Sequence, residues 1–179
     1  MKNVEIVVDG KRYKVQMRDE QISDIIRVDT GYAKERKIGE RYWAQDESNE
    51  YGVSDIKDID SEEDENLFNN ANYYTSEKQA RDNNRADSLM RNLRRWQALN
   101  DNAVIGWDDC NVHKYFIIYD CSTEELSIDY NYFIHCVNVV YFSSIEKANE
   151  AIEAFKNELM WYFTEYQPRL DMFGDGNGD

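Results

Sequence analysis

Residues 114–120 read KYFIIYD, residues 121–124 read CSTE, and residues 126–130 read LSIDY. The two outer segments are rich in aromatic and β-branched side chains, which is typical of strands, and the short polar segment between them predicts a turn. Residues 139–148 (VVYFSSIEKA) then lead into a long stretch with helical spacing of its apolar residues. The order strand, turn, strand, aromatic segment, helix therefore decides the fold that we expect.

The same order occurs once upstream, as a weak internal repeat. Residues 41–46 (RYWAQD) predict a strand, a turn begins at Glu47, and a return strand is expected near residues 53–59. We expect an acidic loop next, after which residues 72–80 (NYYTSEKQA) lead into the first long helix. The two copies together predict two β-hairpins backed by two helices.

The entries and apolar stripes of both helices can be read from local chemistry. Ser143 and Glu146 fit a Ser-x-x-Glu capping box, and Thr75 is the matching N-cap of the first helix, with Lys78 in place of the glutamate. Side chains at helical spacing form an apolar stripe on each helix, and we interpret both stripes as core. Their members are Leu89, Met90, Leu93, Trp96 and Leu99 in the first helix, and Ile145, Ala148, Ile152, Phe155, Leu159 and Phe163 in the second.

The N-terminal part predicts a further hairpin. Residues 4–8 and 12–17 flank Asp9-Gly10, which supplies the positive φ angles that a two-residue hairpin turn needs. Ile22, Ile25 and Ile26 predict a short helix, and residues 31–40 form a basic linker with Lys34, Arg36 and Lys37. The fold class is therefore α+β: an N-terminal hairpin and short helix, then two hairpin-plus-long-helix units whose antiparallel sheets pack on helices. The expected segments are 1–38, 39–100 with the acidic loop, 101–170, and a flexible tail at 171–179.

Charge and composition exclude several classes of protein. The chain has 179 residues and a formal charge of −15, and residues 45–65 alone carry ten acidic side chains against one lysine. Such a balance disfavours a general nucleic-acid binder, which needs a basic surface. We find neither a long apolar run nor a leader-like start, so we expect no membrane association and no export. Three cysteines cannot form a closed set of disulfides, which favours a reducing cytoplasm.

Neither a metal site nor a catalytic centre is expected. Only Cys110 and His113 have ligand-like spacing among the residues that could bind zinc, which also include Cys121, His135 and Cys136. Cys110 or Cys136 could pair with a histidine for nucleophilic chemistry, but the chain has neither a Gly-x-Ser-x-Gly motif nor a phosphate-binding loop. We therefore expect no cofactor, no metal and no enzymatic activity.

Two charged segments are candidate binding surfaces. The first helix carries a basic set that could contact nucleic acid through Arg81, Arg85, Arg91 and Arg95, although pairing with nearby carboxylates is the more common role of such residues. The acidic segment 46–65, together with the acidic C-terminal half, could imitate a phosphate backbone and occupy the basic groove of a nucleic-acid-handling protein, although a solvated loop is again the more common explanation. Lys78 and Arg94 complete the basic set.

Several motifs resemble those of small accessory proteins of phages and mobile elements in Gram-positive bacteria. These motifs are residues 9–15 (DGKRYKV), 39–43 (GERYW), 72–80 (NYYTSEKQA), 115–120 (YFIIYD) and 140–144 (VYFSS). Some proteins of this type are anti-CRISPR inhibitors, so the resemblance implies a phage-encoded anti-defence protein that binds a bacterial RNA-guided DNA nuclease, of type II, in the cytoplasm of the infected host. The alternative is a DNA- or RNA-associated phage accessory protein that uses the basic helix 78–95.

The acidic segment supplies the residues that we expect to contact such a nuclease, because the nuclease carries basic channels for its heteroduplex and its target DNA. The expected contact residues are Asp58, Asp60, Glu62, Glu63, Asp64 and Glu65. A homodimer through exposed tyrosine and tryptophan side chains is a further possibility that the residues leave open.

Overall fold

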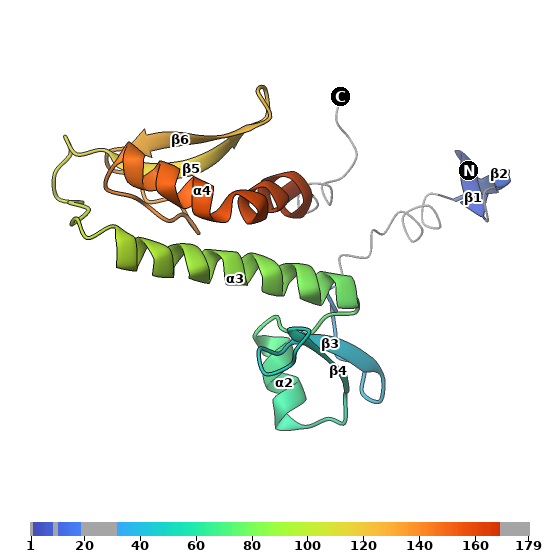
Figure 1. The fold of residues 1–179 in the computed structure, drawn as a ribbon. Coiled ribbons are helices and arrows are strands. Elements are labelled where there is room, and N and C mark those ends of the chain that lie inside the picture. The colour runs from blue at the N-terminus through green and yellow to red at the C-terminus, as the bar shows by residue number, and fades with distance from the viewer. Residues whose placement is uncertain (1, 9–10, 19–31, 169–179) are drawn as a thin grey trace. The chain divides into compact units, whose positions relative to one another are not determined.

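The structure is a computed structural model that describes residues 2–8, 11–18 and 32–168. The chain forms two compact units, Met1–Thr30 and Gly31–Asp179, which are described separately below. The fold is mixed α+β, with antiparallel sheets of two strands each (Figure 1).

The first unit contains the expected N-terminal hairpin. Strands β1 (Lys2–Val8) and β2 (Lys11–Met17) pair antiparallel, and Val8 lies opposite Lys11, so a two-residue connection joins them. The helix expected around Ile22, Ile25 and Ile26 lies outside the described residues.

The first repeat begins with strands β3 (Arg41–Gln45) and β4 (Val53–Lys57), which pair antiparallel with Tyr42 opposite Ile56. Tyr74 extends this sheet by one antiparallel bridge beside β3, because its backbone N–H and C=O both bond to Trp43 at 2.8 Å. Residues 32–38, expected to belong with the N-terminal hairpin, contact this repeat: Tyr32 bridges Tyr74.

A helix occupies much of the stretch where an acidic loop was expected. Helix α2 spans Glu62–Asn69, and Ser61 and Asp64 form a reciprocal capping box at its start. The expectation of a loop was wrong here for an electrostatic reason. Carboxylates in the first turn of a helix stabilise it by facing the positive end of its dipole, so the acidic run favours a helix start.

Helix α3 spans Glu77–Asn100 and is capped by Ser76, whose hydroxyl accepts from the amide of Gln79. The N-cap therefore lies one residue after Thr75, the residue expected to form it. Leu89, Met90 and Leu93 are buried as expected, whereas Leu99 in the last turn is 66 % exposed.

The second repeat follows the same plan. Strands β5 (Lys114–Asp120) and β6 (Glu125–Asn131) pair antiparallel, and Phe142 bridges Tyr115 as Tyr74 bridges Trp43. Helix α4 (Ile145–Trp161) continues into a π-helical segment η1 (Tyr162–Tyr166). The bridging aromatic residue precedes the N-cap by two positions in both repeats, which supports the internal repeat.

The cap of α4 also differs from the expected one. Ser144 accepts from the amide of Lys147, whereas Ser143 bonds through its amide and hydroxyl to the buried carboxylate of Asp101 at the end of α3. Two adjacent serines offer equivalent local caps, and the tertiary contact with Asp101 decides which of them is used. Ile145, assigned to the apolar stripe, is 48 % exposed.

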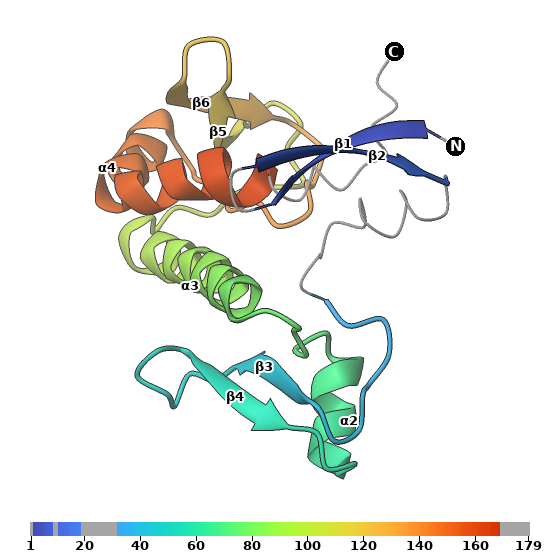
Figure 2. The same cartoon turned by 90° about the vertical axis from the view of Figure 1, so that its right-hand side faces the viewer.

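Helix α3 is shared by both repeats. Its first turns place Ala80 in a cluster with Val53 and Tyr74, and its later turns pack Leu89, Met90 and Leu93 against α4. Figures 1 and 2 show α3 between the β3–β4–α2 layer and the layer formed by α4 with β5 and β6. The segment that follows β4, which carries the candidate site, therefore sits on a sheet that α3 supports.

Candidate functional site

The candidate site is the segment from the end of β4 to the first turn of α2. Asp58 is held at the end of the strand, where its amide bonds to Glu40 and its carbonyl accepts from Gly39. Asp60 then adopts a left-handed backbone (φ 63°), and its amide donates to Asp58 Oδ1 at 2.9 Å. Aspartate tolerates this conformation because its short side chain bonds locally. The turn delivers Ser61 to the N-cap position of α2.

Asp58 is the first of two buried carboxylates beneath this segment. It is fully buried, and Arg36 donates to both of its oxygens, from Nε to Oδ2 at 3.0 Å and from Nη2 to Oδ1 at 2.7 Å. The Tyr73 hydroxyl also donates to Oδ2 at 3.1 Å. The hydrogen bond from Arg36 outweighs the opposing effect of burial, so the pKa of Asp58 is lowered from its ordinary value.

Asp64 is the second buried carboxylate and is 2 % exposed. Its Oδ1 accepts from the Tyr42 hydroxyl at 2.7 Å, and its Oδ2 accepts from the amides of Ile59 and Ser61 and from the Ser61 hydroxyl. Burial by itself opposes ionisation, but these hydrogen bonds outweigh it and hold the pKa of Asp64 well below its usual range. Asp64 is therefore a buried anion neutralised mainly by dipoles.

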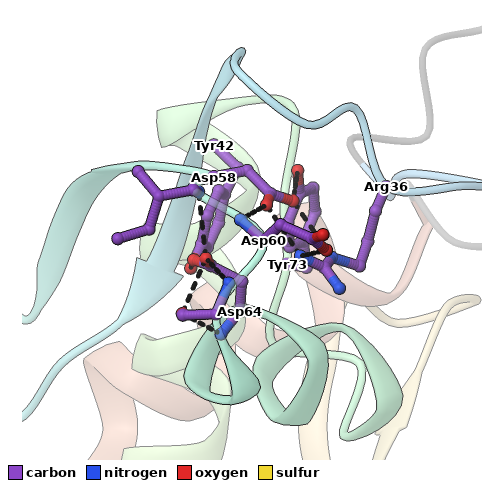
Figure 3. Close-up of polar contacts among 8 residues, drawn as sticks. Arg36, Tyr42, Asp58, Asp60, Asp64 and Tyr73 are labelled. Atoms are coloured by element: carbon purple, nitrogen blue, oxygen red, sulfur yellow. Dashed lines mark hydrogen bonds and ion pairs between the residues drawn. The ribbon is translucent and has the colours of Figure 1, made fainter.

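The two carboxylates are joined through a pair of stacked tyrosine rings (Figure 3). The rings of Tyr42 and Tyr73 lie 3.9 Å apart between centroids and nearly parallel, with an interplanar angle of 10°. Burial is the largest cause that raises the pKa of both hydroxyls, and each hydroxyl donates to one of the carboxylates. Both phenols consequently stay protonated at neutral pH, which keeps the network intact.

The six predicted contact residues divide into two groups. Asp58 and Asp64 are buried and bonded within the chain, so their assignment as contact residues is corrected: they support the segment from beneath. Asp60 is 62 % exposed, with Arg36 at 3.3 Å, and Glu62, Glu63 and Glu65 are exposed in the first turn of α2. We call Asp60, Glu62, Glu63 and Glu65 the acidic edge.

The arginines of α3 are largely used inside the chain. Arg81 pairs with Glu77 at 2.6 Å, Arg85 pairs with Glu158 at 2.7 Å and lies over the Trp161 ring, and Arg91 pairs with Glu47 at 2.7 Å. Of the four predicted nucleic-acid contacts, only Arg95 makes no ion pair with a carboxylate of the described residues. Lys78 pairs with Asp82, and Arg94 donates to Asn138.

The cysteines and histidines are distributed over separate surroundings. Cys110, Cys121 and Cys136 are exposed thiols. His113 bonds to the Tyr115 and Tyr132 hydroxyls through its two ring nitrogens, and His135 stacks on Trp107. Within the described residues, no group of three or more His, Cys, Asp or Glu side chains could hold a metal ion.

Three residues of the site escaped the sequence analysis: Arg36, Tyr42 and Tyr73. Arg36 was assigned to a basic linker, and a basic segment that precedes a strongly acidic one is the signal that could have paired them. The aromatic residues were assigned to a strand and a helix entry, and nothing in their periodicity indicates that their hydroxyls would serve two buried carboxylates.

Comparison with protein-family models, with curated proteins and with solved structures finds no match for this chain. In the part of the chain that the structure describes, no helix has both the length and the apolar character required to cross a membrane. The site is thus defined by its own geometry: exposed carboxylates on a short helix, anchored by two buried ones.

Proposed function

We propose that this chain is an anti-defence protein of the phage accessory type that acts by stoichiometric binding. It places its acidic edge against a basic nucleic-acid channel of its partner and prevents DNA from entering. The motif resemblance makes a bacterial RNA-guided DNA nuclease the expected partner. The observation that carries the proposal is the anchoring of the acidic edge by the bonded carboxylates of Asp58 and Asp64.

Anchoring favours binding because it reduces the ordering that association requires. The backbone of residues 58–65 is held by the ion pair from Arg36 and by the capping box of Ser61 and Asp64. A partner therefore meets carboxylates on a preformed helix turn, and less conformational entropy is lost on binding than for a mobile loop. Exposed charges of one sign also accelerate encounter with an oppositely charged groove.

The internal pairing of the α3 arginines supports this choice over the alternative, a nucleic-acid-associated protein that uses the basic helix. Neutralising phosphates would require Arg81, Arg85 and Arg91 to exchange their carboxylate partners for phosphate groups. Because these three arginines already face carboxylates, the helix gains less from releasing the counterions of DNA than a helix with unpaired arginines would.

The test is a DNA-cleavage assay with a panel of purified type II RNA-guided nucleases and the full chain. The protein is added before or after target DNA at about 0.15 M salt. We expect inhibition to saturate near one protein per nuclease and to weaken when DNA is loaded first. Absence of inhibition by a large excess across the panel would refute the proposed function.

A pair of triple variants tests the acidic edge itself. In one, Glu62, Glu63 and Glu65 are replaced by lysine; in the matched control, the exposed Glu125, Glu146 and Glu153 are replaced instead. Both change the net charge equally, and both place lysine in the first turn of a helix. We expect the inhibitory concentration to rise at least about tenfold for the first variant and much less for the control. Equal effects would show that overall charge, not the acidic edge, drives association.

A mobility-shift assay with bare DNA examines the alternative. We expect no shift at physiological salt. A shift that Arg91→Glu combined with Arg95→Glu abolishes would move the function to the basic helix.

A further inference from the structure

A cavity of about 290 Å³ lies between α3, β5 and the end of α4. It is on the other side of α3 from the acidic edge, which belongs to α2 and the turn before it (Figure 1). Its walls are mostly aliphatic and aromatic, and none of its described lining residues is charged. The main wall residues are Leu89, Met90, Leu93, Phe116, Leu159 and Phe163. A cavity of this composition belongs to the class that binds apolar small molecules.

The cavity also has a polar end, which is lined by Asn138, Tyr162 and Gln167. The Oδ1 atom of Asn138 accepts a hydrogen bond from Arg94 at 3.1 Å, so the amide nitrogen of Asn138 is the atom that can donate to a ligand. These groups are uncharged donors and acceptors, suited to a single hydroxyl, carbonyl or ring N–H of a ligand.

The backbone at this wall is an independent observation, because it has an uncommon conformation. Residues Tyr162–Tyr166 form a π-helix, in which the chain bonds from residue i to residue i+5. This wider turn brings Tyr162 and Gln167, five residues apart, to the same wall as Phe163. Single π-helical turns are uncommon and occur frequently at functional sites, so the widening is not expected of a helix that only packs.

The volume limits the size of the occupant. An apolar cavity of about 150 Å³ accepts one benzene molecule, so about 290 Å³ corresponds to roughly two fused rings. A carboxylate in the cavity would lose hydration without a cation in the lining to pair with, because Arg94 bonds to Asn138 but is not itself a lining residue. From these observations we infer that the cavity binds an uncharged, two-ring-sized apolar molecule whose one polar group bonds to Tyr162, Asn138 and Gln167.

The experiment uses the full chain with 2-naphthol as the probe and 2-naphthoate as its charged analogue. Binding is measured by isothermal titration calorimetry and by ligand-observed nuclear magnetic resonance. We expect 2-naphthol to bind with a dissociation constant between about 10 µM and 1 mM, and 2-naphthoate to bind at least about tenfold more weakly. No binding of 2-naphthol, or equal binding of the two probes, would overturn the inference.

Two variants locate the site, and one control accompanies them. Val140→Phe fills the cavity and should weaken 2-naphthol binding more than about tenfold, whereas Val104→Phe, at a position that is 92 % exposed and not among the lining residues, should leave it within about twofold. Tyr162→Phe removes only the hydroxyl and should weaken binding about threefold to tenfold. Melting curves confirm that each variant is folded. If Val140→Phe does not fold, the Tyr162→Phe result decides, and unchanged binding there overturns the inference.

Discussion

Asp64 offers a sharp test of the anchor beneath the acidic edge, because its two obvious replacements should differ widely in stability. Asp64→Ala removes the acceptor of four hydrogen bonds from Tyr42, Ile59 and Ser61. Asp64→Asn keeps the shape of the side chain and removes only the charge. The acidic edge depends on this residue for its helix start, so the comparison tests the support for the proposed function as well as the stability of the fold.

The size of each effect follows from the hydrogen bonds. In Asp64→Asn, the amide oxygen can take the position of Oδ2 and accept from the Ile59 amide, the Ser61 amide and the Ser61 hydroxyl. The amide nitrogen then takes the position of Oδ1 and donates to the Tyr42 oxygen, which can accept as well as donate. Charge-assisted bonds become neutral ones, so we expect a loss of about 1.5 kcal/mol in the free energy of unfolding.

In Asp64→Ala, the same donors lose their acceptor in a site that is 2 % exposed. Tyr42 is only 1 % exposed, so solvent cannot take the place of the carboxylate as the acceptor for its hydroxyl. The capping box at the start of α2 is lost as well. An unsatisfied buried donor costs about 1–3 kcal/mol, and a lost cap costs about 1 kcal/mol. We therefore expect Asp64→Ala to lower the free energy of unfolding by about 4 kcal/mol.

The assay is urea denaturation of the full chain followed by tryptophan fluorescence, for which Trp43 in β3 is a reporter next to the site. Glu63→Gln, an exposed neighbour in the same helix turn, is the control and should change stability by less than about 0.5 kcal/mol. If Asp64→Asn is as destabilising as Asp64→Ala, the reasoning about dipoles and shape is refuted.

The pH dependence gives a second check. The pKa of Asp64 is lowered in the folded chain, so its stabilising contribution is complete above about pH 5 and is lost as the pH falls through about 4 towards the folded value. The difference in stability between the wild type and Asp64→Asn should therefore be constant from pH 7 to about pH 5 and shrink below about pH 4. A difference that stays constant into acid would contradict the assigned pKa direction.

Three further predictions concern other parts of the fold. Arg36→Met should lower the free energy of unfolding by about 3–5 kcal/mol, because it leaves the buried carboxylate of Asp58 without its cation. Adding Asp58→Asn should restore part of this loss in a double-mutant cycle measured by urea denaturation. Gly52→Ala should lower the melting temperature by several degrees, since Gly52 has a φ of 71° and its Cβ would meet the amide of Asn84; a melting temperature within about a degree of the wild type would contradict this. Lys114→Met should cost about 3 kcal/mol, because the buried ammonium donates to the backbone carbonyls of three residues, and a loss below about 1 kcal/mol in denaturation would show that those carbonyls find other partners.

The internal repeat explains why much of the fold could be predicted from the sequence. The expected strand at residues 114–120 is confirmed residue for residue, and the hairpin partners in both repeats lie within two residues of their expected bounds. Alternation within a strand and turn chemistry act over a few residues, so they leave a signal in the local sequence. The apolar stripes were confirmed in the middle of the helices and failed at Leu99 and Ile145, where a helix end reaches beyond the core.

The candidate site was predicted only in outline. The sequence located the acidic segment, and the exposed carboxylates of the acidic edge are part of the predicted set. It could not separate these from Asp58 and Asp64, because burial of a carboxylate depends on Arg36 and Tyr42, which lie 22 residues away from them in the chain. Nor could it assign the partners of Arg85 and Arg91, which come from other elements of the fold.

By itself, then, the sequence determined the strands of the hairpins, the two long helices, the repeat and the concentration of negative charge around residues 45–65, but not helix α2, because the determined features are properties of neighbouring residues. The tertiary structure alone decided which of two serines caps α4, which carboxylates are buried, which arginines are already paired, and where the apolar cavity lies. The buried carboxylates, the paired arginines and the cavity depend on side chains that are distant in sequence and meet only in the folded chain, and a desolvated charge is stable only where such partners are present together.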